Sequence, residues 1–462
     1  MEYGFCGRSL TITFVIFTYL GTWIGGGTIV GLVGNAYLDG ASQYWIFGIS
    51  CVAGVLFAMF FITRIRRLQV TGIADMLSLR FPEYKEFIRV PATLGLLIRN
   101  VTVVGMNFAA MSYMFTYFAG IDHNLATLLS LFLVVAYTVA SGLWGVVVTD
   151  VLQGFIQTAG MLFLFFSALK NSGGLGSTLD FYERTDQLAA VSLIPSQASA
   201  PTILGFLFLF GLFFLMGDQS DWERIYSCKT DKTAFWGYLI PQSITLLLLL
   251  LPAFTGVLLR TLTNDVSDGY VLYWFVSQML SPQMTIFVIL VIISSVLSSA
   301  DSFMVASGVM FSGDIFHRFI NPEAGDRELI FWTRVVAILA GGIGYAFAIN
   351  MLDIMQLWSV GIGIAAVILL PAYFSAWFSR RVNTQGALAG MGTGIVYCGG
   401  LVLTGASFSV GRVLLGFGLN VLATVVISLS TPPPAPEHVA RTYYWAPHFH
   451  QAENPPDPSG QS

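Results

Sequence analysis

The chain alternates between long apolar runs and short polar connections. A helix that crosses a lipid bilayer needs about 20 mostly apolar residues, and about twelve such runs are present. They lack the alternation over about 10 residues that marks strands of a transmembrane β-barrel. The pattern therefore predicts an all-α polytopic membrane protein with spans at residues 9–33, 42–63, 91–118, 124–141, 145–169, 201–217, 234–258, 283–311, 328–350, 354–378, 385–406 and 412–430.

Composition supports this fold class. Of 462 residues, 55% are apolar and 10% are charged, whereas ordinary soluble domains are about 25% charged. A soluble enzyme and a disordered chain are excluded, as is a nucleic-acid binder, which needs a basic face. We therefore expect the lipid bilayer as a partner and no nucleic acid.

The positive charges of the loops predict the orientation, because Lys and Arg concentrate on the cytoplasmic side. With the N-terminus inside, the inner loops hold most of these residues, including Arg64, Arg66 and Arg67. The outer loops hold only Lys170, Arg184, Arg260 and Arg412. We therefore expect a multi-pass protein of the cell (inner) membrane with both termini in the cytoplasm.

The last part of the chain changes character after residue 430. Residues 431–462 are rich in proline and cannot build a packed core. The sequence thus predicts a transmembrane domain over residues 1–430 and a flexible cytoplasmic tail over residues 431–462. His448 and His450 resemble a metal-binding pair, but we expect them to be incidental residues of this tail.

The first span contains three consecutive glycines, Gly25 to Gly27, with Gly21 and Gly31 on either side. Each glycine weakens a helix by about 1 kcal/mol. The glycines could simply let helices pack closely. Alternatively, they mark an unwound segment whose carbonyl groups bind an ion.

The eighth span carries a stripe of hydroxyl groups next to a carboxylate. Residues four apart lie on one face of a helix, and the stripe comprises Ser294, Ser295, Ser298, Ser299 and Ser302. Such serines can also bond to their own helix, so the stripe alone is a weak signal. Asp301 strengthens it, because a carboxylate in this region costs about 2.5–3.5 kcal/mol unless it has a partner. Carbonyl and hydroxyl oxygens together suit a hard cation such as Na⁺.

The sixth span ends in the polar run Gly217 to Asp221. Interruptions in the first and sixth spans would indicate an inverted repeat of five plus five helices with a binding site between the repeats. In the alternative interpretation, Asp218 only caps a helix at the cytoplasmic boundary.

Several motifs follow one another along nearly the whole chain, which are residues 5–10, Thr22 to Gly27, residues 142–153, Ser298 to Ser302, Glu328 and Leu329 with Arg334, and Gly386 to Gly390. In this order they resemble the sodium:solute symporter family, which has a LeuT-like core. Within that family, Thr22 to Gly27 and Ser298 to Ser302 look most like choline transporters. The resemblance implies repeats at about residues 9–170 and 201–378 and two additional helices over residues 385–430. Family members normally carry one more helix before residue 5, and we expect that helix to be absent here.

The resemblance also implies a sodium site and the residues that form it. Gly21 and Ile24 would supply backbone carbonyl groups from the broken helix, Ser295 another carbonyl, and Ser298 and Ser299 hydroxyl groups. Asp301 would be a neighbouring network residue. Asp150, Gln153 and Arg334 would be interior polar contacts or gate elements.

The solute is less clearly indicated. Trp23 could supply one wall of an aromatic cage for a quaternary ammonium group, but Val103 and Asp218 stand where the resemblance to choline transporters would place aromatic residues. Asp218 could instead pair with an amine. We take Trp23, Val103, Asp218 and Gln219 as the candidate solute-binding residues. Arg99 could meet a carboxylate, but we expect it to extend to cytoplasmic water instead.

These features predict a secondary active transporter that takes up a small organic solute with Na⁺ by alternating access. The solute stays open among amino acids, amines and organic acids. No set of nucleophile, base and orienting group is visible, so we do not expect an enzyme. Two alternatives remain, which are a proton-coupled carrier that uses Asp301 or Asp150, and a non-transporting solute sensor.

Overall fold

The computed structural model describes residues 10–196, 200–351 and 353–445, except the side chains of residues 140–148, 201 and 202. Arg8 and most of the motif at residues 5–10 lie outside the described residues, as do His448 and His450. The side chains of the motif residues 142–148 lie outside them as well. The described chain is helical, apart from an isolated β-bridge between Leu10 and Cys228.

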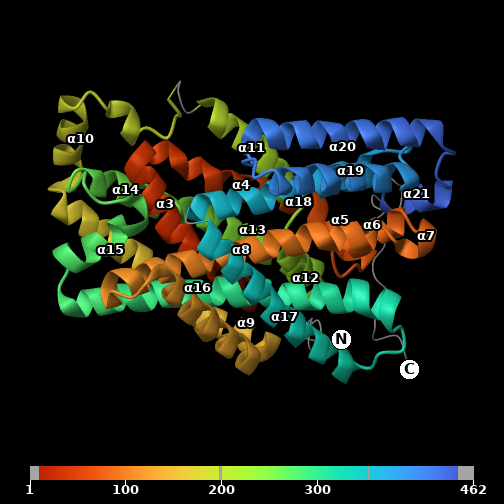
Figure 1. Ribbon diagram of the computed structural model, residues 1–462, viewed down its shortest axis with the longest axis horizontal. Coiled ribbons are helices and arrows are strands. Elements are labelled where there is room, and N and C mark those ends of the chain that lie inside the picture. Colours follow the sequence, from red (N-terminus) through yellow and green to blue (C-terminus); the bar gives the residue numbers. More distant parts are fainter. Residues whose placement is uncertain (1–9, 197–199, 352, 446–462) are drawn as a thin grey trace.

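The helices follow one another without strands in the described ranges (Figure 1). The first half contains α2 (Ile12–Trp23), α3 (Gly26–Asp39), η2 (Ala41–Gln43), α4 (Tyr44–Phe57), η3 (Ala58–Ile62), α5 (Thr63–Leu68), α6 (Ile73–Arg80), α7 (Glu83–Glu86), α8 (Arg89–Ala119), α9 (His123–Asn171), α10 (Gly174–Arg184) and η4 (Leu188–Val191). The second half contains α11 (Ala200–Leu215), α12 (Gln219–Ser227), α13 (Asp231–Leu248), α14 (Leu250–Arg260), α15 (Asp268–Met279), α16 (Pro282–Met310), η5 (Phe311–Ile320), α17 (Asp326–Asn350), α18 (Ile354–Phe378), α19 (Thr384–Leu403), α20 (Val410–Ser430) and α21 (Pro436–Thr442).

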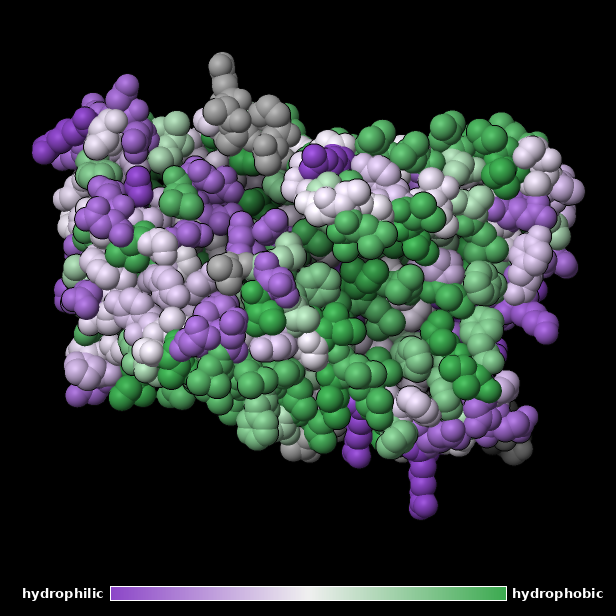
Figure 2. Space-filling view, viewed as in Figure 1, coloured by the Kyte–Doolittle hydropathy of each residue, from purple (hydrophilic) through white to green (hydrophobic). Residues whose placement is uncertain are grey.

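Length and hydropathy agree with a membrane protein. Among the described residues, 10 helices are long and apolar enough to cross a bilayer, or 11 when the bent pair α2 and α3 counts as one span. In lipid a backbone must satisfy its own hydrogen bonds, which is why helices form here. Figure 2 shows a broad hydrophobic face between two more polar ends.

The helical segment α9 (His123–Asn171) covers two of the predicted spans. The hydroxyl groups of Tyr137 and Thr149 form a hydrogen bond although these residues are 12 positions apart. In a straight helix they would be about 18 Å apart at about 1.5 Å per residue, so the chain turns back between them. Two apolar parts, His123–Val139 and Thr149–Asn171, flank residues 140–148, and these parts are what the sequence pattern separated into spans 124–141 and 145–169.

The bundle has a buried centre and a peripheral pair. In α18, 89% of the apolar window is buried inside the protein, whereas the corresponding values for α19 and α20 are 33% and 28%. Figure 1 places α19 and α20, in blue, along one edge of the bundle. These two helices therefore lie outside the part of the bundle that positions the candidate site.

The first span is interrupted, as the glycines suggested. α2 ends at Trp23, α3 begins at Gly26, and the two helix axes differ by 50°. Close packing also holds, since a Cβ atom on Gly26 would lie 2.3 Å from Cγ2 of Val296. The same residues therefore open the helix and bring α16 close to it, and the binding of an ion by the carbonyl groups of the break stays a prediction.

The sixth span is interrupted as well. α11 ends at Leu215, Gly217 adopts φ = +75°, and α12 begins at Gln219. A positive φ favours glycine, which has no Cβ. Asp218 caps α12 in a reciprocal capping box with Asp221. The cap that we considered as the alternative thus exists, but it lies at a break inside the protein, where Asp218 is buried.

The flexible tail predicted from residue 431 is wrong for residues 431–445. α21 packs on α6 and α18, and Thr442 Oγ1 donates to the carbonyl oxygen of Ala376 at 2.8 Å. The guanidinium of Arg64 lies 3.7 Å above the ring of Tyr444. The aromatic residues that follow the prolines bury apolar surface against the bundle, which the proline content concealed. Residues 446–462 lie outside the described residues.

Candidate functional site

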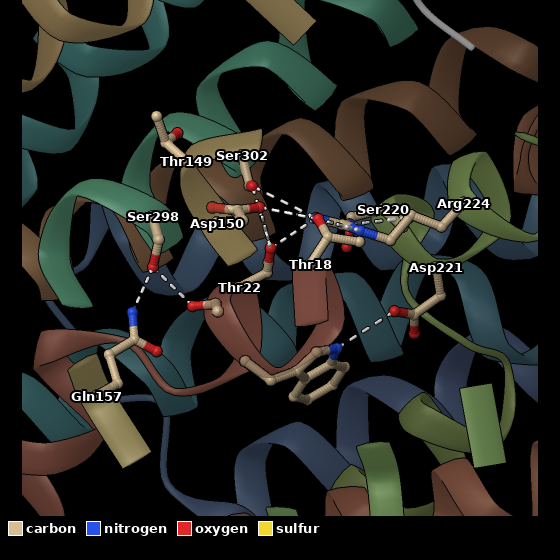
Figure 3. A network of polar contacts seen from close by, with 12 residues as sticks. Thr18, Thr22, Thr149, Asp150, Gln157, Ser220, Asp221, Arg224, Ser298 and Ser302 are labelled. Carbon is tan, nitrogen blue, oxygen red and sulfur yellow. Dashed lines mark hydrogen bonds and ion pairs between the residues drawn. The ribbon is translucent and has the colours of Figure 1, made fainter. Parts of the chain in front are cut away.

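The backbone at the first break meets the hydroxyl stripe of α16. The hydroxyl of Ser298 donates to the carbonyl oxygen of Gly21 at 2.7 Å and lies 3.4 Å from the carbonyl oxygen of Ser295. Ser298 also accepts a hydrogen bond from Nε2 of Gln157 at 2.7 Å. Three of the predicted sodium ligands are therefore gathered at one point between α2, α9 and α16 (Figure 3).

The two remaining predicted ligands lie beside this point. Ile24 is fully buried and has left the helical conformation, with φ = −95° and ψ = 67°. The next residue, Gly25, is so close to Ser299 that a Cβ atom would lie 2.7 Å from its hydroxyl oxygen. Asn107 Nδ2 donates to the same hydroxyl at 3.4 Å. The structure thus brings Ser299 to the break itself.

The chemistry of this donor set fits a sodium ion. The five predicted ligands offer carbonyl and hydroxyl oxygens and carry no formal charge. A hard monovalent cation takes such oxygens, and the ends of an unwound helix leave carbonyl groups available. Since all five residues are buried, water competes little with the protein for the ion.

A second polar cluster lies directly behind the first break (Figure 3). The carboxylate of Asp150 accepts from Thr18 at 2.9 Å and from Thr22 at 3.4 Å. Arg224 points into the same cluster, where its Nη2 donates to Thr22 at 2.6 Å and lies 3.4 Å from Ser302. The prediction that Asp150 makes interior polar contacts is confirmed. Arg224 ties α12 to α2, a role that its assignment to an inner loop did not predict.

Asp301 stands apart in this cluster. It is fully buried, and neither carboxylate oxygen has a hydrogen-bond partner among the described residues. The network role predicted for Asp301 is therefore not supported by a hydrogen bond among the described residues, and its exclusion from the ion ligands stays a prediction.

Sequence reasoning missed Thr18, Thr22, Gln157 and Asn107 as parts of this region. Thr18 and Thr22 are four residues apart and therefore share a helix face. Gln157 follows Gln153 at the same spacing. These spacings were a usable signal, whereas the single Asn107 in a long apolar helix gave little indication of its contact with Ser299.

The second break holds a buried ion pair. Nη2 of Arg99 lies 2.6 Å from Oδ2 of Asp218, and the side chains are 1% and 2% exposed. The guanidinium of Arg99 lies over the rings of Phe303, at 4.4 Å, and Trp358, at 5.8 Å. The expectation that Arg99 extends to water is therefore wrong, because Asp218 pairs with it inside the bundle.

The other three candidate solute-binding residues, Trp23, Val103 and Gln219, contact groups other than Arg99. Nε1 of Trp23 donates to Asp221 at 3.3 Å, and its ring lies 5.1 Å from that of Phe214. Gln219 accepts from the backbone of Ile73 at 3.1 Å and donates to Glu223 at 3.2 Å.

Val103 is buried, and its carbonyl oxygen accepts from Asn107 at 2.9 Å. Trp23 is linked to Asp218 through Asp221, which accepts from Trp23 and shares the capping box of α12 with Asp218. Gln219 is held by α6 and by its own helix, which favours a supporting role, and the solute assignments remain predictions.

Comparisons with known proteins extend these observations. The family model described as "Sodium:solute symporter family" matches residues 3–394. The high-affinity choline transporter 1 of Torpedo marmorata is 25% identical over 405 aligned positions, which cover 83% of this chain and 67% of that protein. The osmoregulated proline transporter OpuE of Bacillus subtilis is 25% identical over 374 positions, which cover 79% of this chain and 75% of that protein.

Among solved structures, a Na⁺-coupled sialic acid symporter in a substrate-bound outward-open state is similar to this chain. Its TM-score is 0.76 at 18% identity, over 94% of this chain and 92% of that one. At this identity the likeness shows the fold alone. The predicted all-α LeuT-like fold is confirmed, and the repeat boundaries remain predictions.

Proposed function

Because the chain belongs to the sodium:solute symporter family, a family of Na⁺-coupled carriers, we propose that it moves an amino acid, amine or organic acid with Na⁺ by alternating access between its two broken helices. The ion and the solute bind at neighbouring points in the centre of the bundle. The cell membrane is the site of action, with both chain termini in the cytoplasm.

Na⁺ binds at the first break. Its ligands are the carbonyl oxygens of Gly21, Ile24 and Ser295 and the hydroxyl oxygens of Ser298 and Ser299. The observation that carries this proposal is the 2.7 Å contact between the Ser298 hydroxyl and the Gly21 carbonyl, which joins residues 277 positions apart in the sequence. An ion placed between α2 and α16 bonds both oxygens at once and holds the two helices together.

The solute binds where the two breaks face each other. Trp23 and Asp218 are the residues that support this placement best, with Val103 and Gln219 behind them. Trp23 reaches across to Asp221 at 3.3 Å, so the conformation of the first break and that of the second are linked. Solute should therefore tighten Na⁺ binding by the same factor by which Na⁺ tightens solute binding.

Uptake into proteoliposomes tests this function. With a panel of labelled amino acids, amines and organic acids, an inward Na⁺ gradient should drive accumulation that a K⁺ gradient does not. Ser298→Ala and Ser299→Ala should abolish the Na⁺ dependence. Ser294→Ala is the matched control, because this serine is on the same helix and its hydroxyl has no hydrogen-bond partner among the described residues.

The proton-coupled alternative rests on one observation, the buried and unpartnered carboxylate of Asp301. A carrier of that kind accumulates solute without Na⁺ and stops when the pH gradient is removed. Asp301→Asn would then abolish uptake while Ser298→Ala would not. A solute sensor would bind solute with Na⁺ dependence and show no accumulation at all.

A further inference from the structure

The ion pair at the second break is buried inside the bundle. Arg99 of α8 and Asp218 between α11 and α12 are each at most 2% exposed. Around them stand the rings of Phe303 and Trp358, and Phe214 stacks on Trp358 with ring centroids 5.8 Å apart. The pair is thus the charged centre of an aromatic enclosure at the place where the proposed function puts the solute.

The pair does not use the full bonding capacity of its members. Arg99 reaches Asp218 through Nη2, and its Nη1 makes one long contact of 3.4 Å with Asn100. Its Nε is buried and has no hydrogen-bond partner among the described residues. A guanidinium can hold a carboxylate through two parallel hydrogen bonds, so Arg99 keeps donors available for a second carboxylate.

The two opposite charges of the pair restrict which kind of solute can bind between Arg99 and Asp218. A cationic solute would take Asp218 away from Arg99, and the neighbouring buried carboxylate of Asp221 already accepts hydrogen bonds from Trp23 and Tyr238. An anionic solute would leave Asp218 without its partner. Removing one partner of a buried pair is strongly destabilising, because an uncompensated charge remains in a medium of low dielectric constant. A solute with one positive and one negative group replaces one ion pair by two and leaves no charge unpaired.

We infer that the solute is a small zwitterion, whose carboxylate binds Arg99 and whose cationic nitrogen binds Asp218. This inference rests on the proposed function, which leaves the solute class open. The adjoining rings of Trp23 and Phe214 offer surface for the apolar part of the solute and for a cationic nitrogen. Amino acids and betaines share this chemistry and differ only in whether the nitrogen carries protons or alkyl groups.

The test measures binding to the full-length protein in lipid nanodiscs, by thermal stability in Na⁺ and by calorimetry. The panel contains the common amino acids, glycine betaine and carnitine as zwitterions, choline and simple amines as cations, and short carboxylates as anions. A zwitterion should stabilise the protein in Na⁺, whereas the cation and the anion of matching size should not. Comparison of the amino acids with the betaines in this panel shows whether the nitrogen of the solute carries protons or alkyl groups.

Charge variants sharpen the result. Arg99→Gln and Asp218→Asn should each weaken zwitterion binding by at least about 100-fold, as expected for one partner of a desolvated charge pair. Arg99→Gln should also gain affinity for the matching amine, and Asp218→Asn for the matching carboxylate. A purely structural pair would give neither gain.

Two controls keep the outcomes distinct. Arg89→Gln removes another buried guanidinium, which forms ion pairs with Asp75, Glu86 and Asp314, and it should lower stability without changing charge selectivity. The double variant Arg99→Gln/Asp218→Asn removes both charges and should keep Na⁺ binding at the first break. Absence of Na⁺ stabilisation in the wild type would defeat the proposed function itself. Normal Na⁺ stabilisation with a preference for cations or anions, or with no zwitterion bound, would overturn this inference alone.

Discussion

The two helix breaks use the same backbone device with opposite chemistry. At the first break, Ile24 and Gly25 interrupt the helix among glycines, and the groups that face it are carbonyl and hydroxyl oxygens. At the second break, Gly217 turns the chain and Asp218 follows it, paired at 2.6 Å with Arg99. One break is polar without formal charge, and the other is built around a pair of full charges.

In the proposed function, the difference corresponds to the ligand that each break releases, which is Na⁺ at the first break and the solute at the second. A sodium ion held only by neutral oxygens is desolvated, yet no fixed carboxylate traps it when the site opens to a compartment of low Na⁺. A charged solute needs opposite charges, and these must be neutralised when the solute is absent. Arg99 and Asp218 neutralise each other. This pairing lowers the free-energy cost of burying the two charges in a medium of low dielectric constant when no solute is bound.

The two breaks are also joined. Trp23 next to the first break donates to Asp221 of α12 at 3.3 Å, and Arg224 of α12 donates to Thr22 of α2 at 2.6 Å. A conformational change at either break therefore alters the contacts of the other. In the proposed function, these two contacts couple the binding of the ion to the binding of the solute.

The largest expected effect comes from breaking the charged site. Asp218→Asn should lower the free energy of unfolding by about 3–5 kcal/mol, because it leaves Arg99 buried without its partner. The double variant with Arg99→Gln should recover most of that loss. Denaturation of the purified variants measures both, and a single variant as stable as the wild type would contradict the pairing.

A smaller effect should follow from filling the neutral site. In Gly25→Ala the added Cβ would lie 2.7 Å from the Ser299 hydroxyl and 2.9 Å from Oδ1 of Asn107. Overpacking of this kind costs about 1–3 kcal/mol, and displacement of Ser299 should weaken Na⁺ binding. Gly342→Ala on α17 is the control, because no atom lies within 4 Å of its added Cβ. Equal Na⁺ affinity in the two variants would show that Ser299 is not a ligand.

The smallest effect is expected at Asp301. Asp301→Asn replaces a buried carboxyl group that has no hydrogen-bond partner among the described residues, so stability should change by less than about 1 kcal/mol or increase. Na⁺ binding at the first break should persist. Asp150→Asn should cost more, since Thr18 and Thr22 both donate to that carboxylate. Calorimetric Na⁺ titrations of the two variants measure the contrast, and loss of Na⁺ binding in Asp301→Asn would move this residue into the site.

The sequence predicted the neutral break far better than the charged one. Three consecutive glycines and a serine stripe with a period of four are local patterns, and they pointed to the break and to the helix that packs against it. The individual residues that meet there were implied by the family resemblance. The partner of Arg99 is far away in the sequence. The local pattern therefore suggested only that the Arg99 side chain extends to cytoplasmic water. Arg99 lies near one end of its predicted span, which is why we expected its guanidinium to reach water.

A second feature depended on tertiary context in the same way. The chain after Thr431 was expected to be flexible because of its prolines, yet Thr442 and Tyr444 are held by the end of α18 and by Arg64. By contrast, hydropathy alone separated the two apolar parts of α9, His123–Val139 and Thr149–Asn171.

The most direct test of the central claim is the thermal stability of the purified protein in NaCl, with KCl and choline chloride as replacements. A ligand that binds only the folded state adds about 2.7 kcal/mol at a concentration 100-fold above its Kd. Stabilisation should be specific for Na⁺ in the wild type and in Ser294→Ala, and it should be lost in Ser298→Ala. Equal stability of the wild type in all three salts, or a Na⁺ effect that survives in Ser298→Ala, would contradict the assignment of the first break as the sodium site.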